Sequence, residues 1–434
     1  MPIAYCLLPT AYTLMMNGIT IINPIGFPNW DDLILSHPEG TIFHTSAWAG
    51  VLRKSYHYTP LYFTAFEGGR IAGLLPVMEV KSFLTGKRGV SLPFTDYCDP
   101  IMNDGLSFKE LFDRVVEFGR KQNWRYIELR ISVARKEQGV SSKGTTSVSG
   151  ESASSEGSPV SPFLSPNTLR LTPDASSDSP TALNLIPTAC SGLPDASSDS
   201  PVDSFASPNA LRLTPNVSYL GHVVDLDGNA EETFGRFRDS ARRNIRKAGK
   251  EGVEVGIFDS SDSVREFYRL NCMTRRDHGL PPQPGAFFRN IHHDVISKGL
   301  GFVALASYQG KRIAGAVFLH FGKKAVYKYG ASDRRYQHLR ANNLVMWEAI
   351  KWHCQNGYRS LCLGRTEPEN QGLIQFKSAL RPSEHPIHYY RYDLKKGAFV
   401  NGSSRVTGFH NEIFKRMPLP ILNKIGSVLY RHVG

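Results

Sequence analysis

Two segments of the chain repeat one pattern, and this duplication constrains the fold more than any other feature. Residues 61–80 and 301–321 each read as a strand, a glycine turn and a second strand, and the turns carry the matching sequences EGGRIAG (67–73) and QGKRIAG (309–315). Glycine adopts the positive φ that a tight turn needs, and the apolar residues after it favour a buried strand. The chain of 434 residues therefore holds two copies of one folding unit.

Helical patterns surround both hairpins in the same order. Apolar residues recur at helical spacing before each hairpin and again after it, where a further strand follows. The expected helices are 45–55, 107–122, 263–276 and 341–355, and the expected following strands are 124–132 and 358–364. We expect an α/β fold of two tandem domains, 17–135 and 219–396, each with a mixed sheet flanked by helices.

Residues 136–218 break this pattern. Proline recurs at every seventh position from 159 to 215, which interrupts any helix and removes donors from any strand. The segment holds only two aromatic residues, Phe163 and Phe205, and so has little to bury. We interpret it as a disordered insert between the two domains.

The first 16 residues share the repeat. PTAYTLM (9–15) is similar to PTACSGL (187–193). No basic residue precedes the apolar stretch, so a signal peptide is not expected. We interpret 1–16 as an extraneous extension upstream of a start near Met15 or Met16, with a short membrane anchor as the alternative.

Charge and cysteine content narrow the choice of partners. The net charge is +12, and because 136–218 is net acidic, the two expected domains carry the excess. A basic surface suits nucleic acid, a phosphorylated sugar or anionic lipid, although solubility alone is an equal explanation. The six cysteines include no CxxC pair, which indicates reduced thiols in the cytoplasm, and no metal-ligand set is evident.

Several longer motifs resemble those of one family, in the same order along the chain. They are SLPFTDYCDP (91–100), SARRNIRKAGKEGVEV (240–255), TRRDHGLPPQP (274–284), YKYGASD (327–333), NNLVMWEAI (342–350) and GRTEPENQGLIQFK (364–377). Together with the hairpins they resemble the FemABX family, and most closely its FemAB-like, exopolysaccharide-associated branch. The resemblance covers most of both domains but neither 1–16 nor 136–218, and it implies two tandem GNAT-like acyltransferase domains.

The resemblance also implies a function. The expected enzyme transfers an acyl or aminoacyl group to an amine of a cell-envelope or exopolysaccharide precursor, in the cytoplasm or at the periphery of the inner membrane. The resemblance further implies aminoacyl-tRNA or acyl-CoA as co-substrate, no tightly bound cofactor, and a phosphorylated or lipid-linked acceptor. The alternatives are an acyl-CoA-dependent N-acyltransferase and a non-catalytic anion- or RNA-binding module. The chain departs from the family at the insert and at 378–381, where an aromatic-glycine ending is expected.

The expected donor site differs from that of an ordinary GNAT domain. Such a domain holds the CoA pyrophosphate in a glycine-rich turn entering a helix, but the equivalent segment, 331–347, contains no glycine. Bulky side chains there disfavour close backbone contact with pyrophosphate, which makes acetyl-CoA the weaker donor. Three arginines of this segment are predicted to bind phosphate through their side chains instead: Arg334, Arg335 and Arg340. Asn342 is a further predicted substrate ligand.

A basic helix at 240–250 is the clearest anion site in the sequence. Asp239 or Ser240 is its expected N-cap. Helical spacing then places four cations on one face, namely Arg243, Arg246, Lys247 and Lys250. This face is predicted to bind phosphates of tRNA or of a lipid- or nucleotide-linked sugar, with a solvated surface as the alternative.

Asp96 is the predicted catalytic base. It follows an expected strand beside Tyr97 and close to Asp99, and a carboxylate beside aromatic rings can have a raised pKa. The resemblance places acceptor contacts in this region, so Tyr97 and Asp99 are predicted substrate ligands. An ordinary Asp-Pro turn is an equal alternative.

Residues of the second domain complete the predicted site. Tyr327 and Tyr329 alternate with Lys328, which predicts that both tyrosines face one side and line the acyl channel, with Tyr329 catalytic; a packed core is the alternative. Arg365, as a catalytic residue, and Lys377, as a substrate ligand, are predicted to contact a carbonyl or a phosphate. An ion pair from Arg365 to a nearby glutamate is the alternative.

The chain ends in a basic amphipathic tail, 397–434. Four cations alternate there with Leu, Ile, Val and Tyr: Lys415, Arg416, Lys424 and Arg431. Such a tail is suited to rest on an anionic membrane surface, and a helix docked on the protein is the alternative.

Overall fold

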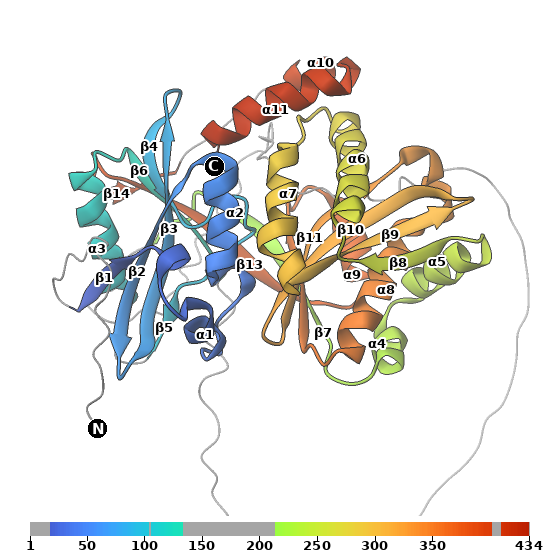
Figure 1. Ribbon diagram of the computed structural model, residues 1–434, viewed down its shortest axis with the longest axis horizontal. Helices are drawn as coiled ribbons and strands as arrows, with labels where there is room; N and C mark the ends of the chain where they lie inside the picture. Colours follow the sequence, from blue (N-terminus) through green and yellow to red (C-terminus); the bar gives the residue numbers. More distant parts are fainter. Residues whose placement is uncertain (1–17, 104–105, 133–212, 402–408, 434) are drawn as a thin grey trace, which may run out of the picture.

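The computed structural model describes residues 18–103, 106–132, 213–401 and 409–433 (Figure 1). The predicted extension 1–16 and almost all of the predicted insert 136–218 lie outside the described residues. The end of the predicted insert is the exception, because strand β7 (Val217–Asp225) begins within it. The second folded unit therefore starts slightly earlier than the predicted residue 219.

The first unit contains the predicted hairpin and helices at nearly the predicted positions. Its strands are β1 (Ile19–Ile22), β2 (Thr59–Glu67), β3 (Arg70–Ser82), β4 (Gly86–Val90), β5 (Ile101–Met102) and β6 (Tyr126–Ser132), and its helices are α1 (Trp30–Leu35), α2 (Ser46–Tyr56) and α3 (Phe108–Lys121). Helix α3 begins at a capping box, in which the side chains of Ser107 and Glu110 each accept from the other's backbone N–H. This local signal explains why its start is readable from the sequence.

The second unit repeats the plan with additional helices. After β7 it contains α4 (Ala230–Arg236), α5 (Asp239–Lys250), β8 (Glu254–Phe258), α6 (Ser261–Asp277), α7 (Gly285–Asp294), β9 (Gly301–Tyr308), β10 (Lys311–Phe321), β11 (Lys324–Ser332), α8 (Ala341–Gln355), β12 (Ser360–Thr366) and α9 (Gln371–Ser378). The chain continues through β13 (Ser383–Asp393), β14 (Ala398–Phe399), α10 (Phe409–Arg416) and α11 (Leu419–Val433).

The strands join one sheet in the order β1-β2-β3-β4-β6-β13-β7-β12-β11-β10-β9-β8. In each unit an antiparallel hairpin, β2–β3 or β9–β10, leads to a third antiparallel strand, β4 or β11. That third strand pairs in parallel with the strand after the helix, β6 or β12. A parallel pair needs a crossover, which α3 and α8 provide. The shared plan confirms the predicted duplicated α/β fold.

Strand β13 joins the two units. It pairs with β6 through 387–393 and with β7 through 383–389, antiparallel on both sides. Because β7 in turn pairs with β12, β13 and β7 bridge the two halves of the sheet (Figure 1). The predicted second domain, 219–396, therefore ends in a strand that also completes the first sheet.

Helices α2 and α7 pack the units together beside this bridge. Trp48 and Tyr56 on α2 lie against Phe287 on α7, with ring centroids 6.2 and 5.4 Å apart, and all three side chains are buried. Burial of each such side chain contributes about 1.5–3 kcal/mol. Lys54 Nζ on α2 also lies 2.6 Å from Asp294 Oδ1 on α7. The buried aromatic contacts and this ion pair together fix the placement of one unit on the other.

The tail folds into α10 and α11 and docks on both units. Leu422 and Tyr430 on α11 are buried. Tyr430 OH donates to Pro281 O (3.2 Å), and Tyr58 OH on the first unit donates to Tyr430 O (2.8 Å). These contacts support the predicted alternative of a docked helix. Within the described ranges, no helix is long and apolar enough to cross a membrane.

Candidate functional site

Strands β11 and β12 run side by side for a short distance and then diverge. They pair only through 324–326 and 360–362. Lys328 on β11 and Gly364 and Arg365 on β12 follow the point of divergence. Residues at the carboxyl ends of parallel strands are where α/β sheets place ligands, so this divergence is a candidate site.

The loop after β4 closes against this divergence from the first unit. Leu92 and Phe94 in the loop have left-handed φ values of 55° and 62°, a strained conformation for bulky residues. The Arg130 guanidinium on β6 donates to two loop carbonyls at 3.4 and 3.5 Å, and Tyr389 OH on β13 donates to Asp96 O at 2.7 Å. These bonds hold the strained loop and fix the position of Asp96.

The Asp96 carboxylate is buried without a hydrogen-bond donor. Its side chain is 2% exposed, and neither oxygen has a hydrogen-bond partner within the described residues. Lys328 Nζ lies 3.8 Å from Oδ2, and a Cβ placed on Gly364 would lie 2.8 Å from the same oxygen. A buried charge that lacks donors costs free energy, and such a group is a strong indication of a functional site.

Three buried cations lie around this carboxylate, and the four residues form what we call the Asp96 cluster: Asp96, Lys328, Arg365 and Lys377. Burial lowers the pKa of Lys328, and the Asp96 charge opposes that shift. Burial also lowers the pKa of Lys377, to about 8, again against the effect of Asp96. A buried cluster with more cations than carboxylates is suited to stabilise negative charge that develops in a reaction.

The two cations of the β12 region are held differently. Lys377 Nζ on α9 donates to Gly364 O (3.1 Å), Arg365 O (2.9 Å) and Thr366 Oγ1 (2.9 Å). The Arg365 guanidinium lies 4.0 Å from the ring centroid of Tyr219, and its Nη1 has no hydrogen-bond partner in the described part of the chain. Lys377 thus fixes the β12 backbone, whereas Arg365 keeps a donor for a ligand.

The cluster contains three predicted site residues: Asp96, Arg365 and Lys377. Tyr97 lies beside it, with its hydroxyl 3.7 Å from Cys362 Sγ. Asp99 instead accepts from Ser132 N and Oγ at 2.6 and 2.7 Å, a contact that favours the predicted alternative of a structural turn. The substrate contacts predicted for Tyr97 and Asp99 stay predictions.

The prediction that Tyr327 and Tyr329 face one side is wrong. The register with β10 shifts here, because Phe318 pairs with Tyr327 while its preceding neighbour pairs with Tyr329, so Lys328 is an extra residue in a β-bulge. Tyr327 packs on Phe318 in one apolar cluster, and Tyr329 packs on Phe288 in the other. The bulge buries Lys328, and its ammonium lies in the Asp96 cluster.

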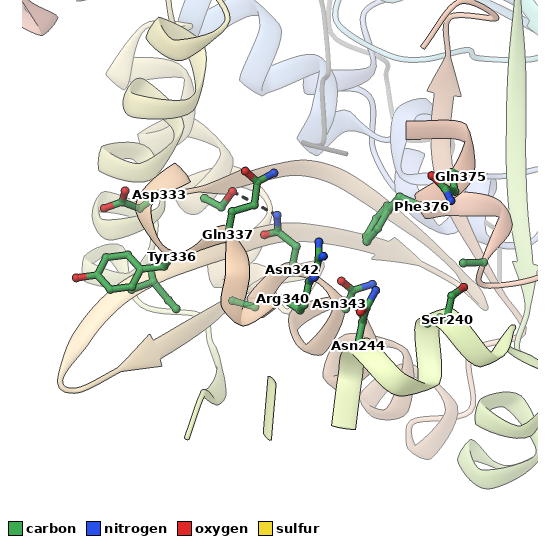
Figure 2. Close-up of a pocket in the computed structure, with 15 residues that line it drawn as sticks. Ser240, Asn244, Asp333, Tyr336, Gln337, Arg340, Asn342, Asn343, Gln375 and Phe376 are labelled. Carbon is green, nitrogen blue, oxygen red and sulfur yellow. Dashed lines mark hydrogen bonds between the residues drawn. The ribbon is translucent and has the colours of Figure 1, made fainter. Parts of the chain in front are cut away.

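A cavity of about 170 Å³ opens in the second unit, and Figure 2 shows the polar side chains that line it. Ser240 comes from the start of α5 and Asn244 from its middle, Arg340 and Asn342 come from the start of α8, and Phe376 comes from α9. We call it the helix-end cavity. Exposed N–H groups at a helix start carry partial positive charge, so two helix starts at one cavity favour an anionic ligand.

The start of α5 differs from the prediction. Asp239 is the first helical residue and pairs with Arg242, while Arg238 occupies the N-cap without a side-chain bond, so the predicted cap by Asp239 or Ser240 is wrong. The predicted cations are exposed and do not line the cavity: Arg243, Arg246, Lys247 and Lys250. Their face of α5 lies next to the face that lines the cavity. Phosphate binding by these cations stays a prediction.

The start of α8 also lacks a side-chain cap. Arg340 occupies the N-cap with a left-handed φ of 59°, a conformation usually left to glycine. The prediction that the lack of glycine disfavours backbone contact with pyrophosphate stays a prediction. Arg340 lines the cavity together with Asn342. Arg334 and Arg335 are exposed, and Arg335 pairs with Asp333 at 2.6 Å. Of the three predicted arginines, Arg340 is the one at the cavity.

Helix α9 lies between the cavity and the Asp96 cluster. Gln375 and Phe376 line the cavity, whereas the ammonium of Lys377 is bound to the β12 backbone. One helix thus positions side chains for both regions. Within the described residues, no group of three or more His, Cys, Asp or Glu side chains could hold a metal ion. Because the starts of α5 and α8 meet at the helix-end cavity, this cavity is the candidate site for an anionic co-substrate.

The chain is similar to known proteins over both units. Residues 235–378, which include the cavity and most of the cluster, match the model of an acetyltransferase (GNAT) domain. The fold is similar to the crystal structure of FemX, with a TM-score of 0.55 and 14% identity over 84% of this chain and 95% of that one. A stretch of 163 residues is 24% identical to UDP-N-acetylmuramoylpentapeptide-lysine N(6)-alanyltransferase of Weissella viridescens. These similarities support the FemAB-like family that the sequence motifs resemble.

The match to the Weissella protein covers 36% of this chain and 48% of that relative, about half of its length. The structural similarity at 14% identity shows the fold of both units. The predicted GNAT-like fold is confirmed, and the matches support the predicted family. The exopolysaccharide-associated branch stays a prediction.

Three residues that shape the site were not predicted: Lys328, Arg130 and Tyr389. Lys328 and Arg130 are charged residues inside apolar strands, which is itself a signal because such residues are rarely buried without a partner. Tyr389 carries no such signal, because its strand comes from the far end of the chain. Its role depends on the position of β13 between the two units.

Proposed function

We propose that the protein is an acyltransferase that moves an aminoacyl group from aminoacyl-tRNA to an amine of a cell-envelope precursor. One observation carries the proposal: Asp96 is buried beside three cations where the two units meet, and no described residue donates a hydrogen bond to its carboxylate. A base that must accept a proton needs a free acceptor oxygen, and the carbonyl under attack needs nearby positive charge. The cluster offers both.

The proposed roles follow from the contacts. The acceptor amine attacks the ester carbonyl of the donor, a C–N bond forms, and the C–O bond to the donor breaks. Asp96 takes the proton that the amine loses, and this proton then passes to the departing alkoxide. The Nη1 donor of Arg365 stabilises the negative charge on the carbonyl oxygen. Lys377 holds the β12 backbone and adds positive charge to the site.

The helix-end cavity is the proposed donor site. The uncapped starts of α5 and α8 and the Arg340 side chain favour the phosphodiester next to the aminoacylated 3′ nucleotide of tRNA or the phosphates of acyl-CoA. The exposed cationic face of α5 lies next to it and is suited to further phosphates, as a tRNA carries. This continuity of positive charge favours aminoacyl-tRNA over acyl-CoA.

The acceptor class comes from the relative, whose name specifies a lysine amine of a UDP-linked muramoyl pentapeptide. We propose an amine-bearing, phosphorylated envelope precursor of this kind, and an exopolysaccharide precursor is the second member of the same class. The test mixes the purified protein and this pentapeptide with alanyl-tRNA or with acetyl-CoA. Mass spectrometry is expected to detect an amide product with alanyl-tRNA. Binding of both substrates without product would instead indicate a non-catalytic binding module.

Replacing Arg340 with Ala is expected to weaken donor binding by about 10- to 100-fold, the range for loss of a charge-assisted hydrogen bond. The reason is that Arg340 is the arginine of its segment that lines the cavity. The measurement is the KM for alanyl-tRNA. The matched control is Arg335→Ala, because Arg335 is exposed and paired with Asp333. Equal effects of the two variants would contradict a donor site at the cavity.

Transfer is expected to fall as the pH rises through about 8, the lowered pKa of Lys377. The contribution of this group to the free energy of unfolding should instead increase as the pH rises. Since burial lowers this pKa from 10.5, the unfolded chain binds more protons between the two values, and this group makes the folded state more stable as pH rises there. The measurement is kcat/KM and melting temperature across this window. A fall in rate that follows a fall in melting temperature would contradict the role of Lys377.

A further inference from the structure

The exposed apolar side chains gather at one edge of the molecule. Among the described residues, eight large apolar side chains are exposed, and five of them lie on α10, on α11 or at the turn between β3 and β4. These five are Phe83, Leu84, Ile413, Ile421 and Val428. We call the surface that they form with the neighbouring cations the tail-and-hairpin surface. Such a concentration indicates a contact surface, since single exposed apolar residues are normally scattered.

The hairpin turn and the end of α11 are held together. The ring of Phe83 lies 4.4 Å from that of His432, and Arg88 Nη2 donates to His432 O at 2.8 Å. Ser82 Oγ lies 3.2 Å from His432 Nδ1. Figure 1 shows the β3–β4 hairpin and the two helices along the same edge. Segments more than 300 residues apart in the sequence thus form one surface.

Helix α11 does not need this outer face for docking. Its inner face carries the buried Leu422, Gly426 and Tyr430 at four-residue spacing. Gly426 is packed so closely that a Cβ there would lie 2.0 Å from Pro282 O. The outer face carries apolar residues and cations at spacings of three and four: Ile421, Lys424, Val428 and Arg431. The described part of the chain therefore leaves these apolar groups exposed to a partner.

The charge of this surface selects the partner. Helix α11 contains no acidic residue, and its outer face presents Lys424 and Arg431. Lys87 is exposed on one side of Phe83 and Leu84, and Lys81 is exposed on the other side, where it also pairs with Glu79 at 2.9 Å. A second copy of the chain would bring these cations against the same cations. A negatively charged lipid surface instead matches both the apolar residues and the surrounding charge.

We propose that the tail-and-hairpin surface binds an anionic lipid bilayer. Phe83, Leu84, Ile421 and Val428 enter the boundary between headgroups and acyl chains, and the cations contact the headgroups. Helix α11 has 15 residues and would extend about 22 Å, too short to cross the bilayer core, so it lies in the membrane plane. This proposal does not depend on the proposed reaction.

The test is co-sedimentation of the purified full chain with two kinds of vesicle. One contains phosphatidylcholine alone, and the other also contains about 30% phosphatidylglycerol as a source of negative surface charge. We expect binding to the anionic vesicles that weakens as salt is added. Two double variants, Phe83→Ser with Leu84→Ser and Ile421→Ser with Val428→Ser, are each expected to lower the partition coefficient at least about tenfold.

Leu35→Ser is the matched control. The Leu35 side chain is 55% exposed, close to the 54% of Ile421 and Val428. Leu35 lies on α1, however, at the opposite edge of the molecule (Figure 1). This variant should bind vesicles as the original chain does. All variants should keep the original melting temperature and transfer rate on a water-soluble acceptor, which separates this test from that of the reaction. The proposal is overturned by equal binding to neutral vesicles, by unchanged binding of both double variants, or by a dimer in light scattering that the same variants dissociate.

Discussion

Replacing Asp96 with Asn is expected to lower kcat for amide formation by at least about 100-fold, the lower range for loss of a general base. Asn keeps the size of the side chain but cannot take the proton of the acceptor amine. Because neither carboxylate oxygen is engaged by a donor within the described residues, the substitution breaks no hydrogen bond of the loop. Binding of alanyl-tRNA at the helix-end cavity should remain.

The substitution should also cost stability. The Asp96 carboxylate is 3.8 Å from the buried Lys328 ammonium, and removing one partner of a buried pair costs about 3–5 kcal/mol. Activity must therefore be measured below the melting temperature of the variant. The control is Asp294→Asn, which also removes a buried carboxylate paired with a lysine, but on α7. Equal losses of kcat in the two variants would show that Asp96 acts through stability rather than as a base.

The order of elements was predictable because its signals are local. Glycine turns, helical spacing and the Ser107–Glu110 capping box each involve residues close in sequence, and the structure places these elements near the predicted positions. The sequence also singled out Asp96, Arg365 and Lys377, which the structure places in one buried cluster, while their roles in catalysis stay predictions. The local sequence does not indicate which side chains or backbone groups each of these residues contacts.

The remaining features arise from contacts between distant segments. The bulge at Lys328 depends on how β11 registers with β10, and strict alternation along one strand cannot reveal such a shift. The position of β13 between the two halves of the sheet depends on two strands that lie 160 or more residues away in the sequence. The predicted N-cap of α5 was wrong for a local reason, because the Asp239 carboxylate forms an ion pair with Arg242.

Replacing Gly364 with Ala is expected to remove most transfer activity by displacing Asp96. Gly364 has a φ of +73°, and the added Cβ would lie 2.8 Å from Asp96 Oδ2. The carboxylate is the atom group that must move, since the Gly364 backbone is held by Lys377 through its carbonyl oxygen. A shift of about 1 Å in a positioned catalytic group can cost about 100-fold in rate. The measurement is kcat for amide formation.

The control for backbone strain is Gly310→Ala. Gly310 has a φ of +72° but nothing within 4 Å of an added Cβ. A left-handed residue other than glycine costs about 1–2 kcal/mol, so both variants should lose at least this much stability. Overpacking adds about 1–3 kcal/mol at Gly364 alone. If Gly364→Ala kept the activity of Gly310→Ala, Asp96 could move without effect on the reaction, and its position beside β12 would not be the basis of catalysis.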